Sequence, residues 1–447
     1  MNDEDQRSAI GTTEPRAVAD TVGPTLKPGE QPLLEPCGEG RQIRRLMLFF
    51  ALVYIVEGLG QAGGLIAQPL TYYLKQVFGW TPVQVTAWLT ILNLPWIIKP
   101  VYGIVSDFVP LFGYRRKAYL ILANAMAAAA FFWVTQVSAP QPLILILLLT
   151  AYAMAISSTL SGAVLVENGQ RFHRSDAFVN QQWLWFNVAA VVSAFLGGEL
   201  VARLSPQGAL HAAAAVIGVA PFAAIFGTLY LIEETPSRLD LAELNNTFRG
   251  LLATFTNREL WLIGLFLFLY YLNPGFGLPL YYYMTDTLKF SQAFIGTLGA
   301  INSIGWIVGA LIYRRWLDGM TSRRLLNFSI LIGAITTAAF LLLSNDISAA
   351  IINFFSGMAG MIAFVATLSL AADFCPKRAE GFAFAALMSI LNLSSALSNN
   401  IGAFLYEHAF HNRLAPLIIV SAASTTAIFV LVPLLRLRDK ASGVPAS

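Results

Sequence analysis

Long apolar runs recur along almost the whole chain and constrain its fold more than any other feature. A membrane-spanning helix needs about 20 mostly apolar residues. Twelve segments meet this need, at residues 46–66, 84–106, 117–137, 141–167, 179–202, 211–232, 258–283, 292–313, 323–343, 347–373, 381–405 and 412–435. Only 12% of the 447 residues are charged, against about 25% in a typical soluble domain. We therefore predict an all-α integral membrane protein with twelve transmembrane helices.

Lysine and arginine residues are distributed unevenly among the predicted loops. With the N-terminus in the cytoplasm, twenty of them fall in inner segments and four in outer loops. Positive charge favours the cytoplasmic side of a membrane, and one missed span would invert every later loop. The asymmetry predicts that both termini are cytoplasmic. We expect the membrane to be a bacterial cytoplasmic (inner) membrane.

The predicted spans and the polar stretches divide the chain into five parts. Residues 1–40 carry eight acidic side chains and no apolar run, which predicts a disordered acidic cytoplasmic tail. Residues 41–232 and 258–436 hold six predicted spans each. Residues 233–257 read as a cytoplasmic linker between these halves, and 437–447 as a second cytoplasmic tail. Two six-helix pseudo-repeat halves with a site between them are a known transporter plan.

A motif between the second and third spans narrows the class of protein. Residues 93–119 read N-L-P-W-I-I-K-P-V-Y-G-I-V-S-D-F-V-P-L-F-G-Y-R-R-K-A-Y. The G-x-x-x-D spacing and the basic cluster resemble the loop signature of the major facilitator superfamily, and the fuller wording resembles the folate–biopterin transporter family. Residues 72–84 and 376–392 agree with that family. The resemblance implies a secondary active transporter, a symporter of a pteridine such as folate or biopterin driven by protons.

The fourth span departs from the family's pattern. Members of the family tend to carry two aspartates there, ahead of a V-E pair. Val166 and Glu167 are present here, but Ser158 and Gly162 stand at the aspartate positions. Ser158 and Glu167 are therefore candidates for substrate binding or coupling. The resemblance therefore identifies the family better than it identifies the substrate or the coupling.

Four charged residues fall inside predicted spans, where an ionised side chain costs about 2.5–3.5 kcal/mol on insertion scales. Glu57 lies about eleven residues into the first span, near mid-membrane. It is the first candidate for a proton-coupling group or for a substrate contact. The alternative is a carboxyl group that is kept neutral or paired with another helix for structure.

Lys99 lies in the second span and could bind a substrate carboxylate. The alternatives are a lysine that extends to the interface, or an ion pair with Glu167 that could also form an inner gate. Glu199 falls near the outer end of the fifth span, where extension to the interface accounts for it.

The loop after the second span contains a second candidate set. It comprises Gly103, Asp107, Gly113, Arg115 and Arg116. In the superfamily that the motif resembles, this set latches the two halves, with glycine permitting a tight turn. We expect Gly103 to open that turn. Alternatively, the basic residues only hold the loop inside. Arg314 and Arg315 follow Gly309 in the second half as Arg115 and Arg116 follow Gly103 in the first.

Polar residues inside the spans suggest a cavity. Ser389 and Asn392 share a face of the eleventh helix with Ser395 and Asn399, because the spacings are three and four residues. Asn302 and Trp306 share a face of the eighth helix, and Trp96 could stack on an aromatic ring. Asn273, Pro274 and Gly275 should break the seventh helix. The alternative for each polar residue is interhelical hydrogen bonding, at about 0.6 kcal/mol per bond.

Other activities lack support in the sequence. The phosphate-binding pattern G-x-x-x-x-G-K-[ST] is absent, no Cys/His spacing suggests a metal, and no basic tract suggests nucleic-acid binding. We expect no enzyme activity and no cofactor. The expected partners are a small-molecule substrate, the lipid bilayer and protons, and the expected state is a monomer. Two alternatives stay open: a non-transporting membrane assembly factor with the same fold, and a transporter of an unrelated small molecule.

Overall fold

The computed structural model describes residues 36–236, 258–317, 319–373 and 380–435. Its contacts divide the chain into two units after Ile43, and every contact discussed below lies within the second unit. Residues 1–35, most of the predicted linker and the predicted tail 437–447 lie outside the described residues.

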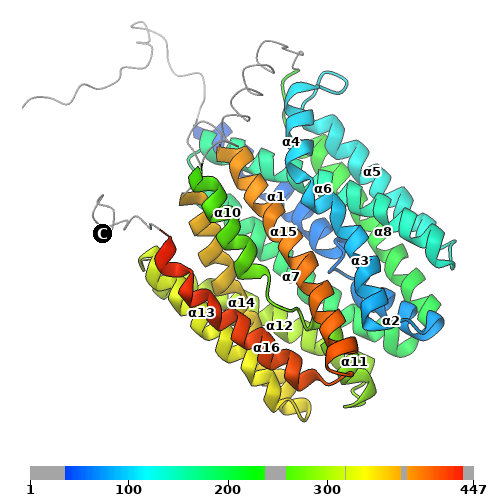
Figure 1. Cartoon of the computed structure of the whole chain (residues 1–447). Coiled ribbons are helices and arrows are strands. Elements are labelled where there is room, and N and C mark those ends of the chain that lie inside the picture. The colour runs from blue at the N-terminus through cyan, green and yellow to red at the C-terminus, as the bar shows by residue number, and fades with distance from the viewer. Residues whose placement is uncertain (1–35, 237–257, 318, 374–379, 436–447) are drawn as a thin grey trace, which may run out of the picture. The chain divides into compact units, whose positions relative to one another are not determined.

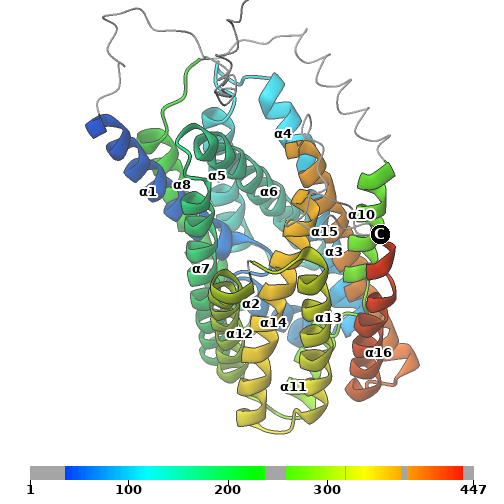
Figure 2. The ribbon, with the colours of Figure 1, turned by 90° about the vertical axis from the view of Figure 1, so that its left-hand side faces the viewer.

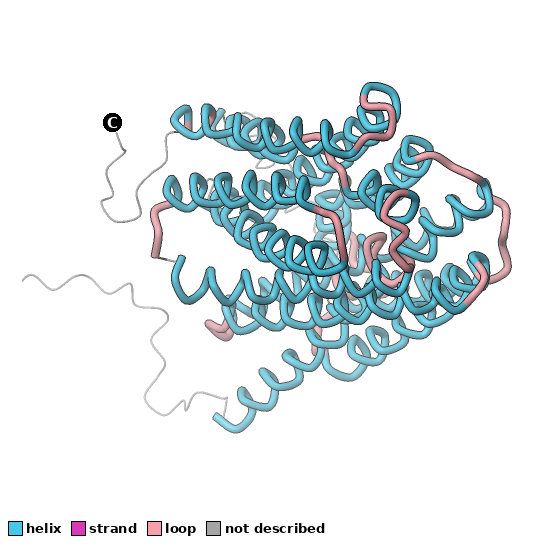
Figure 3. Tube along the Cα trace, turned by 90° about the horizontal axis from the view of Figure 1, so that it is seen from below, coloured by secondary structure: helices cyan, strands magenta, loops and turns pink. Residues whose placement is uncertain are grey.

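The described chain is helical, and its helices are joined by loops (Figure 3). The first half contains α1 (Pro36–Gly60), α2 (Ala67–Phe78), α3 (Pro82–Ile97), α4 (Lys99–Phe108), α5 (Lys117–Val134), α6 (Pro140–Arg171), α7 (Ser175–Arg203) and α8 (Pro206–Leu231). The second half contains α10 (Arg258–Tyr271), α11 (Gly277–Asp286), α12 (Gln292–Ile312) with the π turn η1 (Tyr313–Leu317), α13 (Ser322–Ala339), α14 (Asp346–Asp373), α15 (Glu380–Phe404) and α16 (Leu414–Ala427).

Several helices begin at hydroxyl side chains that cap free backbone N–H groups. Thr81 and Gln84 form a reciprocal capping box at the start of α3. Ser205, Ser291 and Thr321 accept hydrogen bonds from backbone N–H groups at the starts of α8, α12 and α13. These caps explain why helices start where the polar loop residues end.

Eight helical segments within the described ranges are long and apolar enough to cross a membrane, and one of them, Pro82–Phe108, consists of α3 and α4 together. Three of the other four predicted spans are interrupted. The first predicted span ends in a non-helical stretch at 61–66, between α1 and α2, and the seventh is interrupted at 272–276, between α10 and α11. In the twelfth, α16 ends at Ala427 and short 3-10 turns follow. The fourth lies in α15. The count of twelve spans therefore stays a prediction. The expected disorder over 1–40 is wrong at its end, because α1 begins at Pro36.

The most extensive contacts between the halves are those of α7 with α12 and of α3 with α15 (Figures 1 and 2). Within the described residues, α15 also contacts α4, and α11 also contacts α3. The first pair is close because both helices have glycine at the crossing. A Cβ atom on Gly198 would lie 2.7 Å from the Cα of Gly296. In a membrane, such small residues let helix backbones approach and gain van der Waals contact.

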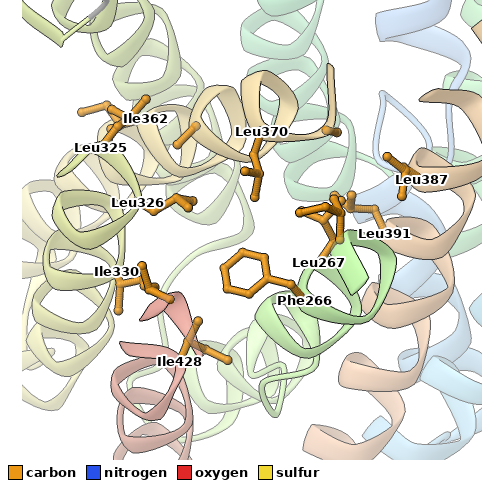
Figure 4. Close-up of a cluster of buried hydrophobic side chains, with 14 of the residues drawn as sticks. Phe266, Leu267, Leu325, Leu326, Ile330, Ile362, Leu370, Leu387, Leu391 and Ile428 are labelled. Carbon is orange, nitrogen blue, oxygen red and sulfur yellow. The ribbon is translucent and has the colours of Figure 1, made fainter. Parts of the chain in front are cut away.

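The second half has its own apolar core, shown in Figure 4. Phe266 of α10 lies among Leu326 and Ile330 of α13, Leu370 of α14 and Leu391 of α15, with Phe266 only 3% exposed. Because α15 also packs on α3, this core holds in place the helix that faces the first half.

Candidate functional site

Lys99 is the first residue of α4, directly after an interruption of the helix. Pro95 lies inside α3, and Ile98 separates α3 from α4. The Nζ atom of Lys99 donates a hydrogen bond of 2.9 Å to the Oγ atom of Ser158 on α6. It also lies 4.3 Å from the centroid of the Trp96 ring, within range of a cation–π contact.

Ser158 connects Lys99 to Glu57. Its hydroxyl donates a hydrogen bond of 2.7 Å to Oε1 of Glu57 on α1 while it accepts from Lys99. A serine hydroxyl can do both because it has one donor and two acceptor positions. Two residues that the sequence predicted as separate candidates are thus joined through a third, from three helices.

Glu167 has a different partner from the one considered in the sequence. Its Oε1 lies 2.8 Å from a guanidinium nitrogen of Arg116, which also forms an ion pair with Asp107. The alternative pairing of Lys99 with Glu167 is wrong in this structure, because Ser158 is the side-chain hydrogen-bond acceptor of Lys99. Glu199, the fourth intramembrane charge, pairs with Arg203 one turn along α7, at 2.7 Å.

The two arginines of the loop have unequal environments. Arg116 is only 7% exposed and also donates to Ser106, whereas the Arg115 side chain is exposed. Glu234 accepts hydrogen bonds from the backbone N–H groups of Arg115 and Lys117, each at 2.7 Å. Its carboxylate thus caps the start of α5, where free N–H groups and the helix dipole favour negative charge.

The expected turn at Gly103 is wrong. Helix α4 continues through Gly103 to Phe108, and a Cβ atom at Gly103 would meet nothing closer than the Cγ2 of Thr159 at 3.9 Å. The turn comes later, where Gly113 has a φ of 83°. That left-handed conformation is the one that favours glycine.

Asn392 brings α15 to the site. Its Nδ2 donates a hydrogen bond of 3.0 Å to the backbone carbonyl of Trp96. About two turns further along α15, Asn400 donates to Oγ1 of Thr90, at 2.6 Å. Trp96 therefore contacts Lys99 with its ring and the second half of the chain with its carbonyl group.

Other predicted polar residues form hydrogen bonds within their own half of the chain. Asn302 donates to the carbonyl of Asn353 on α14, at 3.0 Å, and Ser389 bonds back to the carbonyl of Ala385 in its own helix. Asn302 thus makes the interhelical bond that was the alternative to substrate contact, whereas the bond of Ser389 stays within α15.

Breaks occur at corresponding places in the first and seventh predicted spans. Asn273, Pro274 and Gly275 lie between α10 and α11, where the N–H of Gly275 donates to the carbonyl of Ser398 at 2.9 Å. The helix interruption at 61–66 was not predicted from the sequence, although the glycines within it indicate a non-helical segment. Paired interruptions in the two halves of a transporter mark the neighbourhood of the binding site.

The end of the molecule where α2 and α11 finish carries contacts that the sequence did not predict. Lys75 forms an ion pair with Asp286 and a hydrogen bond with Thr285. Nearby, Nε2 of Gln68 donates to the carbonyl and the side chain of Gln292, at 2.8 and 3.0 Å. These contacts join the first half of the chain to the second at this end.

The sequence pattern of the BT1 family matches residues 59–442, which include almost the whole site. The chain belongs to the BT1 family. The match begins two residues after Glu57 and takes in Trp96, Lys99, Ser158 and Asn392.

The relatives of this BT1 protein confirm the resemblance predicted from the motif. It is 28% identical over 400 residues to the folate-biopterin transporter of Synechocystis sp., an alignment that covers 85% of this chain and 79% of that one. It is 26% identical over 378 residues to folate transporter 2 of Plasmodium falciparum, covering 80% of each chain.

Solved structures confirm the predicted major facilitator fold of this BT1 protein. The xylose transporter XylE from E. coli, in an inward open conformation, superposes with a TM-score of 0.68 at 12% identity, covering 90% of this chain and 98% of that one. The nucleoside transporter NupG superposes with a TM-score of 0.63 at 14% identity, covering 88% and 98%. At such identities the likeness concerns the fold alone.

Proposed function

We propose that this BT1 protein is a secondary active transporter that moves a pteridine, such as folate or biopterin, across the membrane by alternating access, together with protons. Family membership and the names of the relatives support the substrate class. The fold supports the mechanism, because two halves that pack through α7–α12 and α3–α15 can rock about a site between them.

The observation that carries the proposal is the chain of hydrogen bonds from Lys99 through Ser158 to Glu57. It places one positive and one negative group close together in a region where an isolated charge is costly. Each charge compensates the other while the site is empty. A substrate that carries its own charge must therefore change this balance when it binds.

The charge compensation between Lys99 and Glu57 explains how a proton and an anionic substrate could be coupled. When Glu57 accepts a proton, Lys99 loses its compensating charge and becomes a site for a substrate carboxylate. The loaded site, with neutral Glu57 and a carboxylate on Lys99, has the same net charge as the empty one. Binding of either ligand alone leaves an uncompensated charge, which is costly in an apolar environment.

Trp96 and Asn392 are the proposed contacts for the ring system of the substrate. The Trp96 ring is the partner of Lys99, so an aromatic heterocycle could replace the ammonium group on its face. The Asn392 amide, now bonded to the Trp96 carbonyl, supplies hydrogen-bond groups from the second half. Substrate bound here would touch both halves, as alternating access requires.

We propose that both termini lie inside, because of the distribution of lysines and arginines, and that the membrane is a bacterial cytoplasmic membrane. In that orientation the contacts of Lys75 and Gln68 close the outer side. The site would then open toward the cytoplasm in the state that the structure shows.

The proposal can be tested by uptake of labelled folate into proteoliposomes that contain the purified full-length protein. We expect uptake to increase when the outside is made more acidic than the inside. In Glu57→Gln, a permanent mimic of the protonated carboxyl, the pH gradient should no longer drive accumulation, while exchange of labelled for unlabelled substrate continues. Glu199→Gln, which alters a charge paired within α7, serves as the matched control and should keep the pH dependence.

Two results would contradict the proposal. If Glu57→Gln kept the full pH dependence, Glu57 would have no part in coupling. If the wild type moved neither folate nor biopterin and co-purified with a stable membrane partner, the assembly-factor alternative would replace transport.

A further inference from the structure

The equivalent arginine pairs of the two halves have different surroundings. In the first half, Arg116 is buried against Asp107 and Glu167, and Glu234 holds the backbone beside it. In the second half, Arg314 and Arg315 are both exposed on η1. Neither of their side chains has a hydrogen bond or an ion pair with another residue in the part of the chain that the structure describes. Within the described residues this pair therefore has no anionic partner, which leaves it available to an anion from another molecule.

A hollow of about 650 Å³ lies beside this arginine pair. It is lined by Val308, Leu311, Ile312, Arg314, Arg315 and Trp316. The apolar residues come from the last turns of α12, and the arginines and Trp316 come from the π turn that follows. The lining therefore changes from apolar to cationic along the helix axis, as a membrane does from its core to its surface.

The apolar side chains of the hollow face outward. Leu311 is 61% exposed and Trp316 is 68% exposed. Tryptophan is enriched where the hydrocarbon core meets the headgroups, because its ring is apolar and its N–H is polar. Trp316 at the end of a membrane-spanning helix thus indicates the level of the headgroups, and Arg314 and Arg315 lie at the same level.

We propose that this hollow binds an anionic membrane lipid, whose phosphate contacts Arg314 and Arg315 and whose acyl chain lies along Val308 and Leu311. Guanidinium groups match phosphate geometry with two hydrogen bonds each. An acyl chain accounts for the apolar half of the hollow, which a free phosphate ion would leave uncovered. Arg323 and Arg324, both exposed at the start of α13, add positive charge to the same predicted inner segment.

The site can be tested through Trp316, because it lines the hollow. The purified full-length protein is titrated with phosphatidylglycerol brominated on its acyl chain, and tryptophan fluorescence is recorded for the wild type and for Trp316→Phe. The difference between the two isolates the signal of Trp316 from that of the other tryptophans. Brominated phosphatidylcholine, with the same chains and no net charge, is the comparison lipid. We expect the Trp316 signal to be quenched at lower concentrations of phosphatidylglycerol than of phosphatidylcholine.

Two double variants separate a local site from general surface attraction. Arg314→Gln/Arg315→Gln should weaken phosphatidylglycerol binding by more than about tenfold, since it removes the charge-assisted hydrogen bonds to the phosphate within the hollow. Arg171→Gln/Arg174→Gln removes two exposed arginines from the first half and should change binding by less than about twofold. Thermal unfolding of all variants in phosphatidylcholine checks that they fold.

Three results would overturn the proposal. The first is equal quenching by the two lipids. The second is an equal loss of binding in both double variants, which would show general attraction to the surface. The third is full protection of Trp316 by inorganic phosphate or glycerol phosphate at the concentration of the lipid, which would show a site for a soluble anion.

Discussion

The ammonium group of Lys75, in α2, forms an ion pair with the carboxylate of Asp286, the last residue of α11. The Lys75 side chain is 11% exposed and Asp286 is 58% exposed. Lys75 also lies 4.3 Å from the centroid of the Tyr282 ring. One lysine from the first half is thus held by three groups of the second half, counting its bond to Thr285.

Removing this ion pair should loosen the end of the molecule where α2 and α11 meet. In Lys75→Gln we expect faster backbone hydrogen exchange over 67–78 and 277–286, by about fivefold, since a cation–π contact and a partly exposed ion pair together contribute about 1 kcal/mol. Arg203→Gln is the control, because its ion pair with Glu199 lies within a single helix.

Exchanging the two charges provides a second check. In Lys75→Asp/Asp286→Lys the ion pair can form again, so hydrogen exchange should return part of the way toward that of the wild type. No recovery, together with an unchanged rate in Lys75→Gln, would show that this contact does not hold the halves together.

The hydroxyl group of Ser158 should be needed for transport. Ser158→Ala removes one hydrogen bond from Lys99 and one from Glu57, and leaving charged groups unsatisfied costs about 1–3 kcal/mol. We expect kcat/KM for uptake to fall at least about tenfold, which corresponds to about 1.4 kcal/mol. Ser158→Thr keeps the hydroxyl and should retain most of the activity. Equal activity in the alanine and threonine variants would show that the bridge is not used.

Arg116 and Arg115 should differ in their effect on stability. Arg116→Gln leaves Asp107 and Glu167 without their shared partner. We expect a clear loss of thermal stability. Because these carboxylates are 40% and 47% exposed, the loss should be smaller than the cost of breaking a fully buried ion pair, which is about 3–5 kcal/mol. Arg115→Gln, whose side chain is exposed, should unfold within about 0.5 kcal/mol of the wild type. Indistinguishable melting curves of the two variants would contradict the structure of this loop.

Two glycine substitutions test the difference between a tight turn and an ordinary helix position. A Cβ atom on Gly64 would lie 2.3 Å from the backbone oxygen of Leu59. Gly64→Ala should therefore lower the free energy of unfolding of the protein by about 1–3 kcal/mol. Gly103→Ala has open space inside α4 and should stabilise the protein by about 0.5–1 kcal/mol. Thermal unfolding in one detergent measures both, and a loss of stability in Gly103→Ala would contradict the helical assignment at that position.

Much of the fold was predictable because the membrane imposes it. Backbone groups in hydrocarbon must be bonded within their own helix, so long apolar runs identify helices without any knowledge of their neighbours. The same logic identified Glu57 and Lys99, since charges are costly among apolar residues. The motif at 93–119 identified the family, which the match over 59–442 confirms.

The pairing of side chains was not predictable in the same way. Lys99 and Glu167 have opposite charge and lie in the second and fourth predicted spans, yet Lys99 bonds to Ser158 and Glu167 to Arg116. Which residues meet depends on how each helix is rotated about its axis. Ser158 was a candidate because it stands at an aspartate position of the family, but neither composition nor spacing indicated that its hydroxyl would lie between Lys99 and Glu57.

The sequence by itself determined that this chain is helical, crosses a membrane and belongs to its family, because these properties follow from local apolarity and a local motif. Only the tertiary structure decided that Ser158 bridges Lys99 and Glu57, that the first span breaks at 61–66, and that Lys75 ties α2 to α11. These features arise where helices far apart in the sequence approach each other, and their crossing is fixed by the packing of all the side chains between them.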